Sequence, residues 1–289
     1  MKSPFIVAEM GASHNSNFDR ALAIVEAAAK AGANAVKLQT FTPELMVEPD
    51  TVIKAGPWAA RNALELYRQA HTPRSWHKPL FERIRALGMI AFSSVFHPTD
   101  VDFLESLGCP QYKIASFEIT DLDLIRYAAN TGKSIIISTG MANEQEITDA
   151  VTVVDEVQMA KGGTLTLLKC TSAYPTPLAE CNLLTIPDMR AAWTVNVGLS
   201  DHTIGSIAAV TATALGTTMI EKHLTLNRSD GGLDAAFSAE PDEFHHMCTA
   251  CRQVVEAMGT VRYGPTESET PHLSLRRLPG LKRGELTHA

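Results

Sequence analysis

The strongest constraint on the fold of this chain is a regular alternation of short apolar segments and amphipathic helices. The apolar segments are rich in β-branched residues, and each ends in a polar or charged residue. They predict eight strands, at residues 5–10, 35–40, 89–94, 111–116, 134–140, 165–171, 195–201 and 219–225. Between them, apolar residues at three- and four-residue spacing predict helices that end near glycines, among them 20–31, 75–87, 122–131 and 144–160.

Eight strand–helix units in roughly 260 residues are typical of a (β/α)8 TIM barrel, an α/β fold in which one domain of this size is normal. A doubly wound sheet would use fewer strands, and no G-x-G-x-x-G follows the first strand. We therefore expect one barrel domain over residues 1–260. Residues 41–73 form an insertion that is predicted to carry a short helix over the barrel mouth. Residues 261–289 are expected to form a polar linker and a short basic tail.

Composition excludes several classes of protein. The net charge is -7, from 25 basic and 32 acidic residues without a long basic run, which argues against nucleic acid as the main partner. The chain shows neither a signal peptide nor an apolar run of membrane-spanning length. Five widely spaced cysteines do not form a disulfide framework. We therefore predict a soluble, cytoplasmic protein that binds neither nucleic acid nor membrane.

Polar and ionisable residues gather at the predicted carboxyl ends of the strands, where a barrel builds its active site. Unpaired charges inside a barrel cost several kcal/mol each, so these residues imply mutual pairing, an ion or a charged ligand. Two inward lysines would suit a phosphate and a carboxylate on one small molecule, although each lysine could instead pair with a strand-end glutamate. The main candidates are Glu9, Lys37, Gln39, Ser94, Lys113, Ser116, Ser138, Ser172, Tyr174, His202 and His223.

Two of these candidates form a possible metal site. His202 and His223 end adjacent strands, and such a placement can put two imidazoles on one divalent ion. Glu9 could supply or orient an oxygen ligand, which would leave open positions for water and substrate. The alternative is that both histidines are hydrogen-bonded core residues.

Seven ordered motifs lie between residues 4 and 259. They are AEMG at 8–11 with SHN at 13–15, AVKLQT at 35–40, YKIAS at 112–116, STGM at 138–141, CT at 170–171 with YP at 174–175, GLSDHT at 198–203 and EKH at 221–223. Together they resemble the sialic acid synthase family of phosphoenolpyruvate-condensing enzymes. Further segments resemble its pseudaminic acid synthase branch, namely ASFEITD at 115–121, ELY at 65–67, TP at 72–73, GGLD at 231–234 and AFS at 236–238.

The resemblance implies a transferase that forms a carbon–carbon bond. Its substrates would be phosphoenolpyruvate and a 2,4-diacetamido-2,4,6-trideoxy-altrose, and its products a nine-carbon nonulosonic acid and phosphate. His202 and His223 would hold a divalent metal, Mn2+ or else Mg2+ or Co2+, and Glu9 would orient a metal-bound water or transfer a proton. Lys37 and Lys113, with Ser116, Ser138 and Gln39, would bind the phosphate and carboxylate, and Ser94 is counted with them. Tyr174, Ser172 and Asp234 would face the sugar.

The end of the chain departs from the family pattern. Relatives usually continue into an antifreeze-like domain that reaches across a dimer, and here SLRRL at 274–278 and LKRGE at 281–285 resemble only its beginning. Ser13, Val95, His97 and Leu224 also differ from the residues usual in the family. The resemblance implies a homodimer, or a separate protein that supplies the antifreeze-like domain. Three alternatives stay open: an N-acetylneuraminate synthase, a legionaminic acid synthase, and a non-catalytic barrel subunit that needs a partner.

Overall fold

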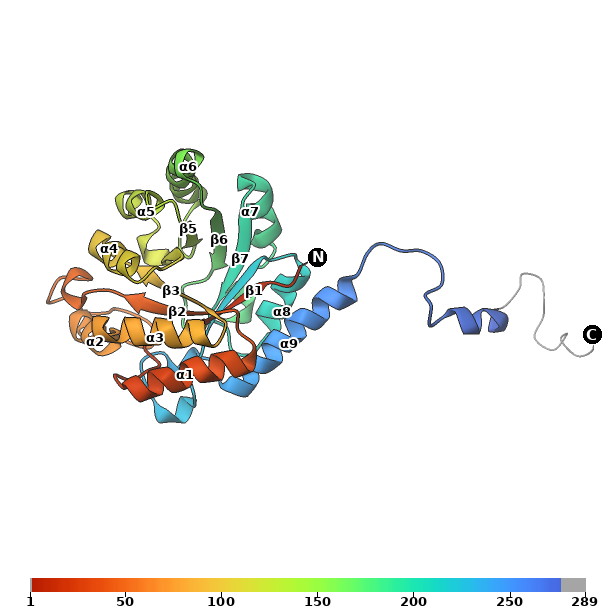
Figure 1. Ribbon diagram of the computed structural model, residues 1–289, viewed down its shortest axis with the longest axis horizontal. Helices are drawn as coiled ribbons and strands as arrows, with labels where there is room; N and C mark the ends of the chain where they lie inside the picture. Colours follow the sequence, from red (N-terminus) through yellow and green to blue (C-terminus); the bar gives the residue numbers. More distant parts are fainter. Residues whose placement is uncertain (1, 277–289) are drawn as a thin grey trace, which may run out of the picture. The chain divides into compact units, whose positions relative to one another are not determined.

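Eight parallel strands close into a barrel in the computed structural model, which describes residues 2–276 apart from the side chain of Met159. Each strand pairs with the next along the chain, and the last pairs with the first (Figure 1). The predicted (β/α)8 barrel is therefore confirmed. The strands are β1 (Phe5–Glu9), β2 (Ala35–Thr40), β3 (Ile90–Val95), β4 (Gln111–Ile114), β5 (Ser134–Ser138), β6 (Leu165–Cys170), β7 (Asn196–Asp201) and β8 (Met219–His223).

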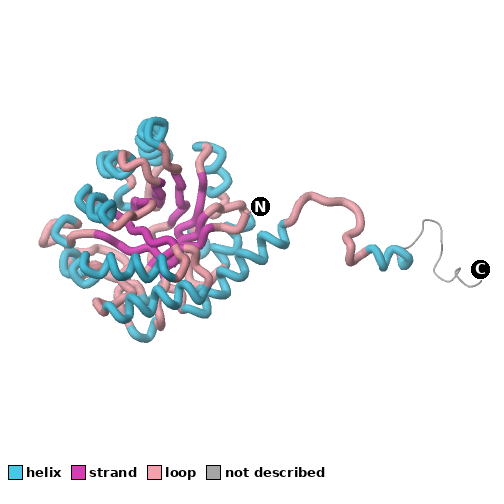
Figure 2. The backbone as a smooth tube through the Cα atoms, viewed as in Figure 1, coloured by secondary structure: helices cyan, strands magenta, loops and turns pink. Residues whose placement is uncertain are grey.

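Helices surround the barrel on its outside (Figure 2). The last of them packs against α1 and α8, so it lies between the first and last units of the ring. The helices are α1 (Phe18–Ala31), α2 (Ala63–Ala70), α3 (Arg74–Ala86), α4 (Pro98–Ser106), α5 (Leu122–Ala129), α6 (Glu144–Lys161), α7 (Thr185–Trp193), α8 (Ile207–Ala214) and α9 (Pro241–Met258). Helix α2 is the short helix that was expected in the insertion after β2.

Local sequence explains where the helices begin and end. The side chain of Asn17 accepts a hydrogen bond from the backbone of Arg20 at 2.9 Å, which caps the amino end of α1. Gly32 ends this helix with φ 91°, a conformation that favours glycine. Asn143 and Glu146 form a reciprocal capping box at the start of α6. These signals lie within a few residues of the predicted helix ends.

The fourth strand is shorter than predicted, and the difference matters for the site. Residues 111–116 were expected to be extended, but β4 ends at Ile114 and Ser116 begins the 3-10 helix η2 (Ser116–Glu118). The hydroxyl of Ser116 accepts a hydrogen bond from the backbone of Gly140 at 3.1 Å. The chain therefore turns across the mouth at this point. The predicted strand 35–40 coincides with β2, and the others differ from the observed strands by one or two residues at an end.

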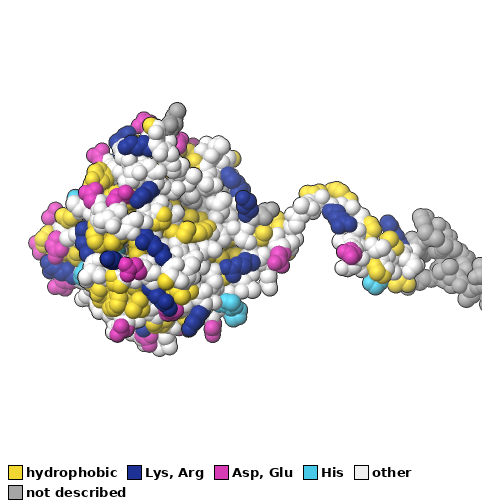
Figure 3. All heavy atoms as spheres, in the orientation of Figure 1, with side chains coloured by type: hydrophobic (Ala, Val, Ile, Leu, Met, Phe, Trp, Pro, Cys, Tyr) yellow, Lys and Arg dark blue, Asp and Glu magenta, His cyan; other side chains and the backbone are white. Residues whose placement is uncertain are grey.

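The core lies between the strands and the helix layer, where residues such as Ile6, Val36 and Ile137 are almost completely buried. Acidic and basic side chains are interspersed over the face of the molecule drawn in Figure 3. All five cysteines are buried free thiols. Within residues 2–276, no helix combines the length and apolarity that a membrane crossing requires.

The chain divides by its internal contacts into residues 1–258, which form the barrel unit, and residues 259–289. The second unit contains one short 3-10 helix, η6 (Thr270–Leu275), within its described part. The predicted LKRGE segment at 281–285 lies outside the described residues, and so does the end of SLRRL. The interpretation of this region as the start of an antifreeze-like domain stays a prediction.

Candidate active site

A buried polar cluster lies where β1, β2 and β3 end. The ammonium of Lys37 of β2 lies 2.9 Å from the carboxylate of Glu9 of β1 and donates to the hydroxyl of Ser94 of β3 at 2.9 Å. The amide of Gln39 donates to the other oxygen of Glu9 at 2.8 Å. Alternation along β2 predicted that Lys37 and Gln39 share a face, and both contact the same carboxylate. The structure therefore brings these four candidates together.

Glu221 of β8 completes this cluster, although sequence reasoning gave it no role. Its carboxylate lies 3.5 Å from the Lys37 ammonium and accepts a hydrogen bond from Ser200 at 3.3 Å. Burial raises the pKa of Glu9 to about 7, against the opposing effect of Lys37. Burial also opposes ionisation of Glu221, but Lys37 and Lys113 hold its pKa below the usual range. Lys37 and Lys113 therefore both favour the ionised form of Glu221.

Lys113 of β4 differs from Lys37 in its partners. Its side chain is buried, and its ammonium donates to the backbone oxygen of Ile114 at 3.0 Å. Within residues 2–276 it forms no ion pair, whereas Lys37 contacts two carboxylates. Burial lowers the pKa of Lys113, and Glu221 opposes this effect. A buried ammonium without a carboxylate is costly, so an anionic ligand is the natural counter-charge.

Hydroxyl groups line the mouth beside Lys113. Ser116 accepts from the backbone of Gly140, and a Cβ atom at Gly140 would stand 2.7 Å from the Ser116 hydroxyl and closer still to that of Ser172. The hydroxyl of Ser138 is buried and has no hydrogen-bond partner in the described residues. Because Gly140 has no side chain, the space between these hydroxyls stays open. Backbone amides and hydroxyls around such a space suit an anionic group. We call Ser116, Ser138, Gly140 and Ser172 the hydroxyl cradle.

The two predicted histidines lie side by side, with ring centroids 5.6 Å apart. Nδ1 of His202 lies 3.1 Å from the Thr171 carbonyl oxygen; donation there leaves Nε2 free to accept. Nδ1 of His223 is buried and has no hydrogen-bond partner in the described part of the chain. Burial holds the pKa of His223 well below its usual range, with His202 adding to the effect. A neutral imidazole is the form that binds metals.

The donors fit an open metal site with two protein ligands. Across the described residues, no group of three His, Cys, Asp or Glu side chains is arranged to hold a metal ion. Two adjacent imidazoles and an orphaned His223 nitrogen nevertheless match an ion whose remaining positions are filled by water and substrate. Glu9 contacts Lys37 and Gln39 rather than the histidines, so its predicted role as a metal oxygen ligand has no direct contact to support it.

An aromatic wall, formed by Trp58, Tyr174 and Phe237, borders the histidines. The centroid of the Tyr174 ring lies 4.3 Å from the centroid of the His202 ring and 5.0 Å from that of the Phe237 ring. Trp58, from the insertion after β2, lies 5.5 Å from Tyr174 and donates to the backbone oxygen of Leu233 at 3.0 Å. Sequence reasoning predicted Tyr174 but missed Trp58 and Phe237. Their contact with Tyr174 could not be predicted locally, because the three residues come from distant parts of the chain.

Asp234 lies beside the same wall. Its carboxylate accepts from the backbone of Ala12 at 2.7 Å and lies 3.6 Å from Nδ1 of His223. Burial raises the pKa of Asp234 to about 6. Gly11 has φ 48°, and a Cβ atom there would collide with the Asp234 carboxylate. The loop after β1 therefore needs a glycine to approach the predicted sugar-facing residue.

Glu118 is a further buried carboxyl group at the mouth. One of its oxygens is buried without a hydrogen-bond partner in the described residues. Burial raises its pKa to about 7, while Lys113 of β4 lowers it and Asp121 of the same loop raises it. Tyr67 of α2, in the insertion after β2, lies near Glu118, because the Glu118 carboxylate contributes to the raised pKa of the Tyr67 phenol. Folding therefore favours the protonated form of Glu118.

We expect Glu118→Gln to stabilise the protein more at pH 8 than at pH 5. The folded pKa of about 7 lies above the ordinary value of 4.5, so the contribution of Glu118 to stability is present below pH 4.5 and is lost as the pH rises through 7. Glutamine does not titrate, so the variant does not lose this stability. Its advantage over the parent in unfolding free energy should therefore be about 2–3 kcal/mol larger at pH 8 than at pH 5. Urea unfolding at both pH values measures it. The exposed Glu82→Gln is the control, and an equal effect of Glu118→Gln at both pH values would contradict the prediction.

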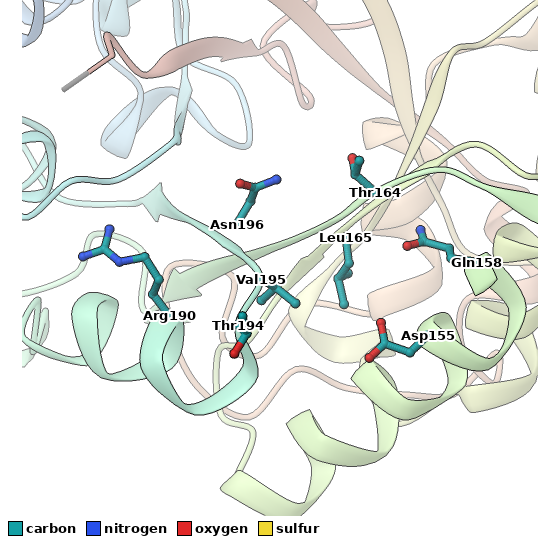
Figure 4. A pocket seen from close by; sticks show the side chains of 8 residues that line it. All are labelled: Asp155, Gln158, Thr164, Leu165, Arg190, Thr194, Val195 and Asn196. Atoms are coloured by element: carbon teal, nitrogen blue, oxygen red, sulfur yellow. The ribbon is translucent and has the colours of Figure 1, made fainter.

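A hollow of about 380 Å³ lies at the opposite end of the barrel, where β6 and β7 begin (Figure 4). Asp155, Gln158 and Arg190 are among the residues that line it. The guanidinium of Arg190 donates to the backbone oxygens of Gly216 and Leu215, at 2.8 and 3.0 Å. Its charge therefore stabilises the backbone carbonyl groups that follow α8. The candidate active site is the mouth at the other end of the barrel.

Comparison with known proteins identifies similar chains of the same fold. Residues 24–263 match the NeuB family. Pseudaminic acid synthase of Helicobacter pylori is 45% identical over 263 residues, which cover 90% of this chain and 76% of that protein. N,N'-diacetyllegionaminic acid synthase of Campylobacter jejuni is 35% identical, with coverage of 99% and 88%. The crystal structure of N-acetylneuraminic acid synthetase from Leptospira borgpetersenii, in complex with citrate, superimposes with a TM-score of 0.84 at 29% identity, covering 95% of this chain and 92% of that one.

Proposed function

The chain belongs to the NeuB family, and from this membership we propose that it condenses phosphoenolpyruvate with 2,4-diacetamido-2,4,6-trideoxy-altrose. The products would be a nine-carbon nonulosonic acid and phosphate, which is the reaction of a pseudaminic acid synthase. One observation carries the proposal. Two buried lysines and the hydroxyl cradle lie at the same mouth as two adjacent histidines, so an anion site and an electrophile site share one space.

Lys37 and Lys113 would bind the phosphate and carboxylate of phosphoenolpyruvate, with help from the hydroxyl cradle. Lys113 has no carboxylate partner among residues 2–276, and Lys37 is held by Glu9, Glu221 and Ser94 in a fixed position. Charge-assisted hydrogen bonds from both would orient the enol carbon toward the sugar. Ser94 and Gln39 would act by fixing Lys37 and Glu9, which they contact at 2.9 and 2.8 Å.

His202 and His223 would hold a divalent ion, for which Mn2+ is the first candidate and Mg2+ and Co2+ the others. Such an ion supplies Lewis-acid polarisation of the sugar aldehyde when it is bound. The chain contributes the neutral imidazole of His223 and an oriented His202, whose Nδ1 faces the Thr171 carbonyl. Asp234, Ser172 and Tyr174 would face the sugar and hold its carbonyl end near the enol carbon.

The atoms of the reaction balance with water as the further reactant. A bond forms between the enol carbon and the aldehyde carbon, and the aldehyde oxygen takes up a proton to become a hydroxyl. Water adds at the adjacent cationic carbon and loses a proton, and the carbon–oxygen bond to phosphate then breaks, so that a ketone forms and the remaining proton of the water leaves with the phosphate. Glu9 would orient this water or take its proton, since Lys37 and Gln39 fix both of its oxygens at the ends of the strands. Positioning and electrostatics would supply most of the rate.

The aromatic wall favours a 6-deoxy, acetamido-bearing sugar over a polyhydroxylated one. Trp58, Tyr174 and Phe237 offer ring faces beside the histidines, and these faces suit methyl groups better than hydroxyls. Relatives named pseudaminic acid synthase, at 45% and 40% identity, support the same choice. The legionaminic acid and N-acetylneuraminate activities are the alternatives, because relatives with those names also match.

We further propose a cytoplasmic homodimer in which a partner covers the mouth. Apolar side chains in the segments after β4, β5, β6 and β7 are exposed, and exposed apolar side chains at one end of a barrel favour association. They are Phe117, Met141, Leu184 and Ile207. A separate protein with an antifreeze-like domain, paired with a non-catalytic barrel, is the alternative. The assignment of residues 261–289 to a linker and the start of such a domain belongs to this proposal.

The proposed function is tested by phosphate release from phosphoenolpyruvate in the presence of Mn2+. The 2,4-diacetamido-altrose sugar, its manno isomer and N-acetylmannosamine are compared in parallel. We expect turnover with the altrose sugar alone. Turnover with the manno isomer or N-acetylmannosamine instead would replace the pseudaminic assignment with the legionaminic or neuraminic one. Thermal stabilisation by phosphoenolpyruvate without turnover of any sugar would favour the non-catalytic subunit.

A further inference from the structure

A second buried ion pair lies next to the two histidines and has no part in the proposed chemistry. The ammonium of Lys222 lies 2.8 Å from the carboxylate of Asp201, and their side chains are only 2% and 1% exposed. Asp201 is the last residue of β7, and Lys222 is its register partner on β8. Each is therefore the residue immediately before one of the histidines, His202 or His223.

The pair lies on the outer side of the barrel wall. Glu221 and His223 contact residues of the mouth, so alternation along β8 turns Lys222 toward the helix layer. The other residues that β7 and β8 turn toward this side, Val197, Leu199 and Ile220, are apolar and buried. An ion pair in an apolar layer carries a desolvation penalty that its attraction does not always repay, so stability alone is a weak reason for it.

The remaining hydrogen bonds of the pair converge on the residue after His202. Lys222 donates to the backbone oxygen of Thr203 at 2.7 Å. The second oxygen of Asp201 accepts from the backbone and the hydroxyl of Thr203, at 2.9 and 2.7 Å. Lys222 is thus bonded to the residues on both sides of His202. It ties the short segment that carries His202 to the strand end that carries His223.

We propose that the ion pair of Asp201 and Lys222 is a positioning device for the metal site: it fixes the separation and direction of the His202 and His223 imidazoles. The inference rests on the proposed function only through the metal site of those two histidines. It adds two positioning residues that never touch the substrate. Groups that orient ligands from behind them typically change metal affinity by about 10–100-fold when they are removed.

The test is the affinity of the full chain for Mn2+, measured from the electron paramagnetic resonance signal of the free ion. The double variant Asp201→Asn/Lys222→Met removes both charges together and leaves no unpaired buried ion. We expect its dissociation constant for Mn2+ to rise about 10–100-fold. The affinity for phosphoenolpyruvate without metal should stay unchanged, because Lys37 and Lys113 lie on other strands.

Two further variants keep the test decisive. Asp201→Asn alone preserves the size of the side chain and an oxygen that accepts from Thr203, so it should fold and lose Mn2+ affinity to a smaller extent. Lys222→Arg keeps the charge and should lose less affinity than the double variant. Circular dichroism establishes folding for each. Parental Mn2+ affinity in folded Asp201→Asn and in the folded double variant would overturn the inference.

Asp100→Asn is the matched control. Asp100 is a buried carboxylate after β3 that pairs with Arg74 at 2.9 Å and accepts from the backbone of Phe96. It should lower stability and leave the Mn2+ affinity unchanged, whereas an equal loss of affinity would mean general loosening and would also overturn the inference. His202→Ala separates the two proposals. If it binds Mn2+ like the parent, the metal site itself is wrong, and the positioning role falls with it.

Discussion

Replacing His202 with alanine is expected to slow phosphate release about a thousandfold while phosphoenolpyruvate still binds. Polarisation of the aldehyde by a metal is worth several kcal/mol in the transition state, and each 1.4 kcal/mol corresponds to about a tenfold change in rate. The lysines and the hydroxyl cradle, which would bind the anion, do not depend on His202 for their contacts. Stopped assays of phosphate with the altrose sugar and calorimetry with phosphoenolpyruvate measure the two effects separately.

His245→Ala is the control for this experiment, because His245 is exposed on α9. It should keep the parental rate. Loss of phosphoenolpyruvate binding in His202→Ala would show that the histidine supports the whole mouth rather than the metal. Retention of more than about a tenth of the rate would contradict a role in polarising the aldehyde.

The fold could be predicted from the sequence because its signals are local and repeated. Apolar strands and amphipathic helices alternate eight times, and this period alone selects a closed barrel. The order of strands then places His202 and His223 on neighbours, since β7 and β8 pair in register. Strand ends were predicted less well. Ser116 leaves the strand because of a hydrogen bond with Gly140, 24 residues away, and no local propensity encodes that bond.

The site was predictable where charge and strand position coincide, and it was not where loops meet. Lys37 and Glu9 lie on adjacent strands at paired positions, so their contact follows from the register. Trp58 reaches Tyr174 and Leu233 only because the insertion after β2 folds toward the loops after β6 and β8. The direction of a long loop is a tertiary property, so no sequence pattern marks Trp58. Lys222 received no role although it lies between Glu221 and His223 in the EKH motif, because it faces the other side of the strand and pairs with Asp201.

Lys113→Met and Lys37→Met should give opposite results for stability although both lysines are proposed to bind phosphoenolpyruvate. Lys113 is buried without an ion pair in the described residues, so its replacement by an apolar side chain should leave the free energy of unfolding unchanged or raise it. Lys37 lies 2.9 Å from Glu9 and 3.5 Å from Glu221. Its removal would leave buried carboxylates without their partner and should cost about 3–5 kcal/mol.

Binding should separate from stability in the same pair of variants. Each lysine would contribute charge-assisted hydrogen bonds of about 1.5–3 kcal/mol, so Lys113→Met should weaken phosphoenolpyruvate binding about tenfold to a hundredfold while the protein stays fully folded. Urea unfolding and calorimetry at one pH give both quantities. Lys37→Met/Glu9→Gln should recover part of the lost stability, because one carboxylate is neutralised, but none of the binding. If Lys113→Met bound phosphoenolpyruvate like the parent, the buried ammonium would have no ligand to explain it, and the anion site would have to be placed elsewhere.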